Sequence, residues 1–267
     1  MSVIFSPLYP APFEPLDYPF THARILHTGV WLTGGTITAS STNADFFASG
    51  PTNILTYERW KPSSVPATWE YDAGTDVTAD CFCIGAHTAG TTGATVTFEI
   101  WTGAAWVEIG ETTPADNMPI MLLLGEPVTF SKWRVSIDVI CEIGVAKAGL
   151  AMQMTRPIYG GVEPTHLNRM TEFRQNTSET GEFLGSTKQR VGLMTSHSWQ
   201  HVTADWVRDT WRPFQVATEG VPFFIAWRPE TFTEVVLMNP TQFTTPSNMG
   251  IRNLMTVGFS GRGHGYD

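Results

Sequence analysis

Short segments in which apolar and polar residues alternate run through the first half of this chain, and they constrain its fold more than any other feature. In the clearest example Val96, Phe98 and Ile100 alternate with polar residues, a turn of small residues follows, and Trp106 begins a second apolar segment. Alternation with a period of two around a glycine-containing turn predicts an antiparallel hairpin with one buried face. A single hairpin is not stable alone, so it must belong to a larger sheet.

Similar segments recur throughout residues 24–155, for example at 36–41, 80–87, 133–140 and 149–154. Many short strands separated by turn residues indicate a β-sandwich or jelly roll. We therefore predict that residues 24–155 form a β-sandwich with almost no helix.

The pattern changes after residues 156–164, whose proline and glycine content is typical of a linker. In the region 165–267, strand-like segments surround polar turns, and the segment VTADWVRDTWRPF predicts a helix. Thr203 is a suitable N-cap for this helix, and Pro213 is expected to end it after about two turns. We predict a small α+β domain here.

The first 23 residues are predicted to form an extended arm. Prolines alternate there with five aromatic residues: Phe5, Tyr9, Phe13, Tyr18 and Phe20. So many prolines exclude a helix and favour a polyproline-like conformation. Aromatic rings left in water are unfavourable, so the arm either wraps its own domain or docks on a neighbouring subunit. The residues leave both alternatives open, and we predict that the five rings contribute to subunit contacts.

Composition narrows the function classes. Charged residues make up only 15% of the chain and the formal net charge is −9, without a cluster of Lys and Arg, so we expect no nucleic-acid partner. The longest apolar run, 118–125, is too short to span a bilayer, and the start of the chain lacks the pattern of a signal peptide. Cys81, Cys83 and Cys141 are expected to be buried free thiols, which indicates folding in a reducing compartment such as the cytoplasm.

The sequence contains no convincing catalytic or metal-binding motif. His197 and His201 have the spacing of a helical metal site, but no glutamate follows His197 and the residues between them are weak ligands. Asp72, Asp76 and Asp80 lack the dense spacing of a calcium loop, so solvated turn acids are the simpler interpretation. We expect no enzymatic activity, no cofactor and no bound metal.

Several of these segments occur in an order that resembles the discoidin family. The segments are TITASS (36–41), PTNILTYERWKPSS (51–64), ATWEYDAG (67–74), FEIWTGAAWVEIG (98–110), FSKWRVSI (130–137) and VAKAGLAMQM (145–154). The resemblance covers roughly residues 24–155 and implies an eight-stranded, galactose-binding-like jelly roll. The disulfide that usually joins the ends of extracellular members has no cysteine pair here.

The resemblance also implies a ligand site at one end of the sandwich. In discoidin-type domains the loop after the TASS strand often carries exposed aromatic residues, and here that loop contains Phe46 and Phe47. Together with Trp60 they are the candidate ligand-binding residues, by stacking on a sugar or another protein. The alternative is that these rings belong to the core or to subunit contacts.

The second region resembles tail-associated structural proteins of tailed bacteriophages, through the segment WVRDTWRPFQVATEGVPFFIAWRP at 206–229. This resemblance implies a virion protein made in the host cytoplasm, with copies of itself and other virion proteins as partners. We therefore predict a structural subunit of a bacteriophage virion, such as a tail, baseplate or fibre-attachment protein. The alternative is a carbohydrate-binding module that attaches to a cell-surface glycan.

Overall fold

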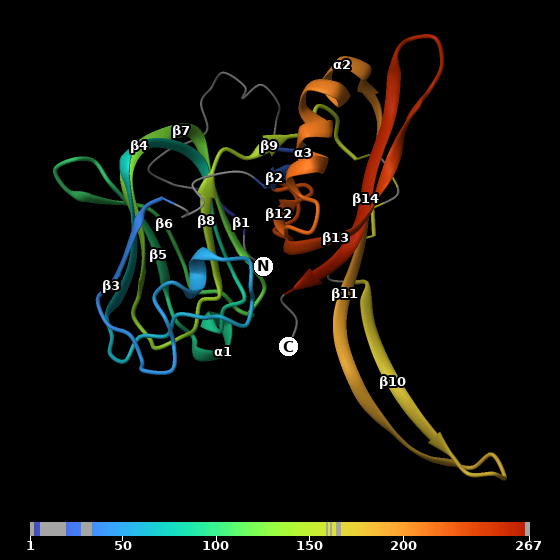
Figure 1. Cartoon of the computed structure of the whole chain (residues 1–267), viewed down its shortest axis with the longest axis horizontal. Helices are drawn as coiled ribbons and strands as arrows, with labels where there is room; N and C mark the ends of the chain where they lie inside the picture. Colours follow the sequence, from blue (N-terminus) through green and yellow to red (C-terminus); the bar gives the residue numbers. More distant parts are fainter. Residues whose placement is uncertain are drawn as a thin grey trace.

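The structure is a computed structural model that describes residues 3–5, 20–27, 34–158, 160, 162–163 and 167–264. A β-sandwich packs beside a second β-sheet, and a helical segment covers the other face of that second sheet (Figure 1). The prediction of a mainly β chain with a sandwich and a smaller α+β part is confirmed. Within the described residues, no helix has the length and apolar character needed to cross a bilayer.

Two long strands build the sandwich by bending, so that each takes part in both layers. They are β4 (Ala67–Gly85) and β7 (Ile120–Ile137), which pair antiparallel with shifts of register after Asp72 and Ala79. Such irregularities bend a strand and increase its twist. The six sandwich strands that lie within the predicted range, β3 to β8, thus supply eight strand segments, because β4 and β7 each count twice.

The two layers follow from the pairing of the strand halves. In the first layer β4 pairs with β3 (Thr36–Ala39), and β7 pairs with β5 (Val96–Trp101), which pairs with β6 (Trp106–Thr112). In the second layer β4 pairs with β8 (Val145–Gly149), and β7 pairs in parallel with β1 (Val3–Phe5). Two short helical elements, η1 (Gly50–Thr52) and α1 (Ala89–Thr92), lie in the loops.

The predicted hairpin has the expected alternation. Val96, Phe98 and Ile100 are buried in the sandwich core, and the residues between them face outward. Trp101 and Trp106 are directly opposite each other at the end of the hairpin, with ring centroids 5.5 Å apart. The two tryptophans are partly exposed and therefore cover the outer face of the sandwich rather than its core.

The second sheet has seven strands in the order β10-β11-β14-β13-β12-β2-β9. Its strands are β10 (Arg169–Thr177), β11 (Phe183–Thr203), β14 (Leu254–His264), β13 (Val235–Asn248), β12 (Phe223–Ala226), β2 (Arg24–Leu26) and β9 (Met152–Gln153). Both ends of the predicted sandwich region, β2 and β9, thus pair in the second sheet. The chain enters and leaves the sandwich through these strands.

The second sheet covers one layer of the sandwich. Phe224 and Leu237 pack against Cys81 and Cys83 on the outer face of that layer, so the layer is buried on both sides. This is why the end of β4 is a continuous buried apolar run instead of an alternating one. All three cysteines are free and buried, as predicted.

The helical segment differs from the prediction at Pro213. The segments α2 (Ala204–Trp206), η2 (Val207–Trp211) and α3 (Arg212–Ala217) follow one another without a break. The middle segment is a π-helix, whose wider turn changes the hydrogen-bond pattern directly before the proline. Pro213 then occupies the first turn of α3, where a missing N–H is tolerated. The prediction that Pro213 ends the helix was therefore wrong.

Candidate functional site

The long loop between β3 and β4 carries the aromatic residues that the sequence indicated. Its turns are closed by backbone hydrogen bonds, from Asn43 to Lys61 (2.8 Å) and from Gly50 to Phe47 (2.9 Å). Phe46 is partly buried, and the Lys61 ammonium lies 5.1 Å from the centre of its ring. Phe47 is 66% exposed and is therefore available to a ligand.

Trp60 does not belong to this exposed surface. Its side chain is fully buried in the sandwich core, and its Nε1 donates a hydrogen bond of 3.0 Å to the carbonyl oxygen of Ser41. Its backbone also pairs with Ile143 through two hydrogen bonds of 2.9 Å. Because neither face of the ring is exposed, Trp60 anchors the loop to the sandwich and is not a ligand contact.

Tyr57 is an exposed aromatic residue that the sequence analysis missed. It is 75% exposed and lies on the same loop as Phe47. The turn after Phe47 packs at Gly50 against the backbone of Glu58 and Arg59, which follow Tyr57 directly. No local pattern distinguishes an exposed tyrosine from a buried tryptophan three residues later, because both stand in the same irregular segment.

Charged residues anchor the same loop. Arg59 and Lys61 each contact Glu142, at 2.9 and 3.1 Å between nitrogen and oxygen. Burial by itself raises the pKa of the Glu142 carboxyl, but hydrogen bonds and charge from Lys61 and Arg59 outweigh burial, so the pKa is lowered. The ionised carboxylate thus ties the loop to the segment before β8, and the aromatic side chains stand on a fixed base.

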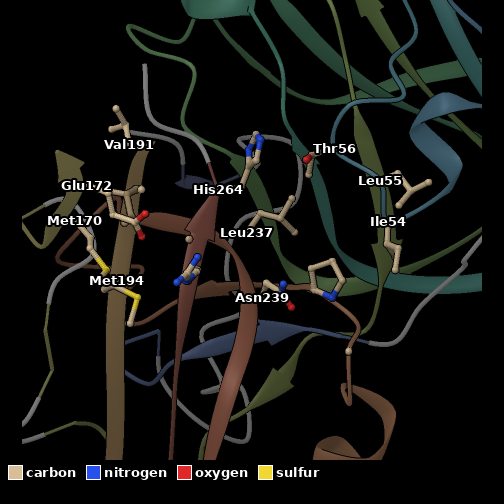
Figure 2. Close-up of a pocket in the computed structure, with 16 residues that line it drawn as sticks. Ile54, Leu55, Thr56, Met170, Glu172, Val191, Met194, Leu237, Asn239 and His264 are labelled. Carbon is tan, nitrogen blue, oxygen red and sulfur yellow. The ribbon is translucent and has the colours of Figure 1, made fainter. Parts of the chain in front are cut away.

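A pocket of about 460 Å³ lies where this loop meets the second sheet (Figure 2). Ile54 and Leu55 approach it from the loop, Met170 and Met194 from β10 and β11, and His264 from the end of β14. Burial first, and then the charge of Arg59, lower the pKa of His264, so its imidazole is neutral at pH 7. The pocket is mixed in character, with apolar walls and a few polar groups.

The pocket lies where a projecting ribbon leaves the second sheet. Strands β10 and β11 leave the second sheet together as a curved two-stranded ribbon (Figure 1). Strand β14 pairs with β11 only from Leu193 onward, so within the described part of the chain residues 183–191 pair with β10 alone. Register shifts leave Leu184 and Gln189 of β11 without a direct partner, and such bulges bend a ribbon.

The ribbon exposes large apolar side chains. Phe173 is 59% exposed, and Phe183 and Leu184 beside the terminal turn are 64% and 67% exposed. Phe183 is opposite Thr177 in the pairing, and Thr177 shares a strand face with Phe173. Both rings therefore lie on one face of the ribbon.

The predicted subunit-contact arm is described only at its two ends, and both ends lie on their own chain. Val3–Phe5 pair with β7, and Val3 and Phe20 each pack against the core between the sandwich and the second sheet. Tyr9, Phe13 and Tyr18 lie outside the described residues. The intersubunit role of the five rings stays a prediction, although the ends match the alternative of an arm wrapped over its own domain.

Buried ionisable groups are found between the sandwich and the second sheet. Burial lowers the pKa of Lys147 to about 7, and its ammonium donates a hydrogen bond to the carbonyl oxygen of His27.

The two histidines with the spacing of a helical metal site, His197 and His201, both lie in the strand β11 and not on a helix. His197 is buried. Within the described parts of the chain, no three His, Cys, Asp or Glu side chains are grouped so that they could hold a metal ion.

Comparison with protein families finds no family that matches this chain, and comparison with curated proteins finds no matching relative. Among solved structures, chitosan-binding module 1 of a chitosanase/glucanase from Paenibacillus sp. IK-5 is 20% identical, with a TM-score of 0.40; the match covers 46% of this chain and 98% of that one. The family 32 carbohydrate-binding module from C. perfringens NanJ, in complex with galactose, is 13% identical, with a TM-score of 0.37; the match covers 45% and 98%.

A third similar structure is SpGH29, which is 18% identical with a TM-score of 0.37; the match covers 45% of this chain. The matched part spans only 27% of the length of SpGH29. With identities and scores this low, the three likenesses assign neither a ligand nor an activity to this chain.

Proposed function

We propose that this chain is a structural subunit of a bacteriophage virion that acts through protein–protein contacts. The projecting ribbon is the observation that carries the proposal. Among the described residues, its outer part has no third strand and no packed face, and a two-stranded hairpin of this kind is at best marginally stable in water. Phe173, Phe183 and Leu184 would also remain in water. A partner protein that covers the ribbon would stabilise the hairpin and remove these apolar side chains from water.

The virion assignment within this proposal is supported by the sequence resemblance of residues 206–229 to tail-associated proteins of tailed bacteriophages. Low overall charge suits such a role, because protein interfaces are depleted of Lys and Glu and enriched in aromatic residues.

Light scattering on the full chain and on a shortened variant tests the contact function. In the variant, an Asn-Gly turn joins Glu172 to Arg190, which are opposite each other in the ribbon, so a tight hairpin closes at its base. We expect the full chain to form oligomers, and the variant to stay monomeric with an unchanged melting temperature. A full chain that is monomeric at every concentration, or a variant with the same mass distribution as the full chain, contradicts the proposal.

Carbohydrate binding is the second candidate function, because Phe47 and Tyr57 present two exposed aromatic side chains on one anchored loop. Several similar structures are carbohydrate-binding modules, so galactose and chitosan fragments are suitable probes. One stacked ring contributes about 1 kcal/mol, or roughly fivefold in affinity. We expect Phe47→Ala and Tyr57→Ala each to weaken binding by this factor in calorimetry, and Phe173→Ala on the ribbon to leave it unchanged. Failure of both sugars to bind contradicts this candidate.

A further inference from the structure

The strand β10 is a long and regular edge of the second sheet. It stands at the end of the strand order, and among the described residues nothing pairs with its outer side. Exposed edges are often protected by proline, by charged side chains, especially lysine, or by a bulge. The nine residues of β10 (RMTEFRQNT) include neither proline nor lysine, and the bulged residues of the ribbon lie in β11. The edge is therefore open to pairing with another extended strand.

The sequence of β10 is complementary to itself when two copies run antiparallel. If Phe173 is opposite Phe173 of a second copy, then Glu172 is opposite Arg174, and Arg174 is opposite Glu172. Opposite charges directly across an antiparallel pair attract each other, and paired aromatic rings stabilise a sheet. Phe173, Glu172 and Arg174 are all exposed, so their side chains are available for these contacts.

The neighbouring registers lack this complementarity. A slip by one residue places Phe173 opposite Glu172 or Arg174 and removes both charge pairs. A slip by two residues places either two Glu172 or two Arg174 side chains opposite each other, and like charges at such positions repel. The charge pattern thus favours this register over its neighbours.

The same register brings together the two Phe173 side chains, which meet at the centre of the contact. One contact would then cover the exposed Phe173 ring of each copy. Because the same surface is used by both copies, the contact has two-fold symmetry and closes on itself.

From these observations we infer that β10 pairs with β10 of a second copy, antiparallel, about a two-fold axis at Phe173. The inference rests on the proposed contact function and names its partner, a second copy of this chain.

Exchange of the two charges tests the register. Glu172→Arg brings Arg opposite Arg174, and Arg174→Glu brings Glu opposite Glu172, so each single change should weaken dimerisation by roughly tenfold in sedimentation. The double variant, Glu172→Arg with Arg174→Glu, restores both pairs and should dimerise like the original chain. The control is Glu182→Arg, an exposed charge beside the terminal turn, which should have no effect. If the double variant is as weak as the single ones, the proposed register is overturned.

A cysteine at the axis tests the geometry. Directly opposite residues of an antiparallel pair have Cα atoms about 4.5–5.5 Å apart, which a disulfide can span. Phe173→Cys should therefore form a dimer linked through its own new thiol under mild oxidation. The control is Gln175→Cys on the same strand face, whose two copies would lie about 13 Å apart and should not cross-link. The native cysteines are buried and do not compete.

The outcomes separate this inference from the proposed function. If both single charge variants still form oligomers and both cysteine positions cross-link equally, the β10 contact is overturned. If the ribbon-shortened variant is nevertheless monomeric, the contact function stands with another partner surface. A full chain that is always monomeric overturns both.

Discussion

Acid should destabilise this protein through His197, whose surroundings in β11 accept only a neutral ring. The hydroxyl of Thr195 donates to the carbonyl oxygen of Glu163 at 2.8 Å, so at 2.9 Å from His197 it must accept a hydrogen bond from Nε2–H. The other ring nitrogen, Nδ1, is buried without a hydrogen-bond partner among the described residues. Trp199 and Phe259 pack against the ring, with centroids 5.9 and 5.3 Å away. Burial lowers the pKa of His197 to about 3.

The sign and size of the effect follow from proton linkage. The pKa of His197 in the folded protein lies below the unfolded value of 6.5, so between these values the unfolded chain binds more protons. The stability contributed by the neutral ring is present above pH 6.5 and is lost as the pH falls toward 3. Between pH 7.5 and pH 5 the loss amounts to about 2 kcal/mol.

Urea unfolding of the original chain and of His197→Gln, at both pH values, measures this loss. Glutamine can donate the same hydrogen bond to Thr195 but does not titrate. The pKa of His27 is lowered to about 4 by burial and by Lys147, so His27 also makes the protein less stable in this pH range, but it does so equally in both proteins. We expect the pH-dependent loss to be smaller by about 2 kcal/mol in the variant. An equal loss in the two proteins would refute the assignment to His197.

Three further predictions concern the sandwich. Gly90→Ala places a Cβ atom 2.2 Å from the backbone carbonyl of Asp116, so a large fall in melting temperature is expected; an unchanged one would mean that this contact relaxes freely. Trp60→Ala should lower the free energy of unfolding in urea by about 3–5 kcal/mol, and the sugar affinity of the folded fraction should not change. A specific loss of affinity would show that Trp60 belongs to the ligand site. Deletion of residues 2–20 removes the pairing of Val3–Phe5 with β7, so it should lower the urea midpoint as well as alter association; an unaltered midpoint contradicts the packing of β1.

Much of the sandwich could be predicted from the sequence, because its information is local. The alternation at Val96, Phe98 and Ile100 identifies a strand with one buried face, and the small-residue turn before Trp106 identifies its partner strand. The free state of the cysteines also follows from their number and their apolar surroundings. The exposed Phe47 lies in the loop where the family resemblance placed it.

Other features were decided only by the tertiary structure. The three residues of β2 are buried and pair in the second sheet, but so short a segment does not reveal its partner strand. Trp60 is core and Tyr57 is exposed within one irregular loop, because the contact with Ile143, far away in sequence, determines which ring is covered. Pro213 is tolerated because a π-helical turn precedes it.

The ribbon shows most clearly which features the sequence determines and which the tertiary structure decides. The sequence predicted strands around polar turns in this region without bounds for each strand, and the structure has β10 and β11 there. That no third strand of the described chain pairs with their outer part depends on where β14 begins to pair, at Leu193. Local side-chain pattern specifies the conformation of a strand, whereas its neighbours are set by packing between segments distant in sequence. For this reason the sequence determined that β10 is a strand, and only the tertiary structure decided that it is a free edge.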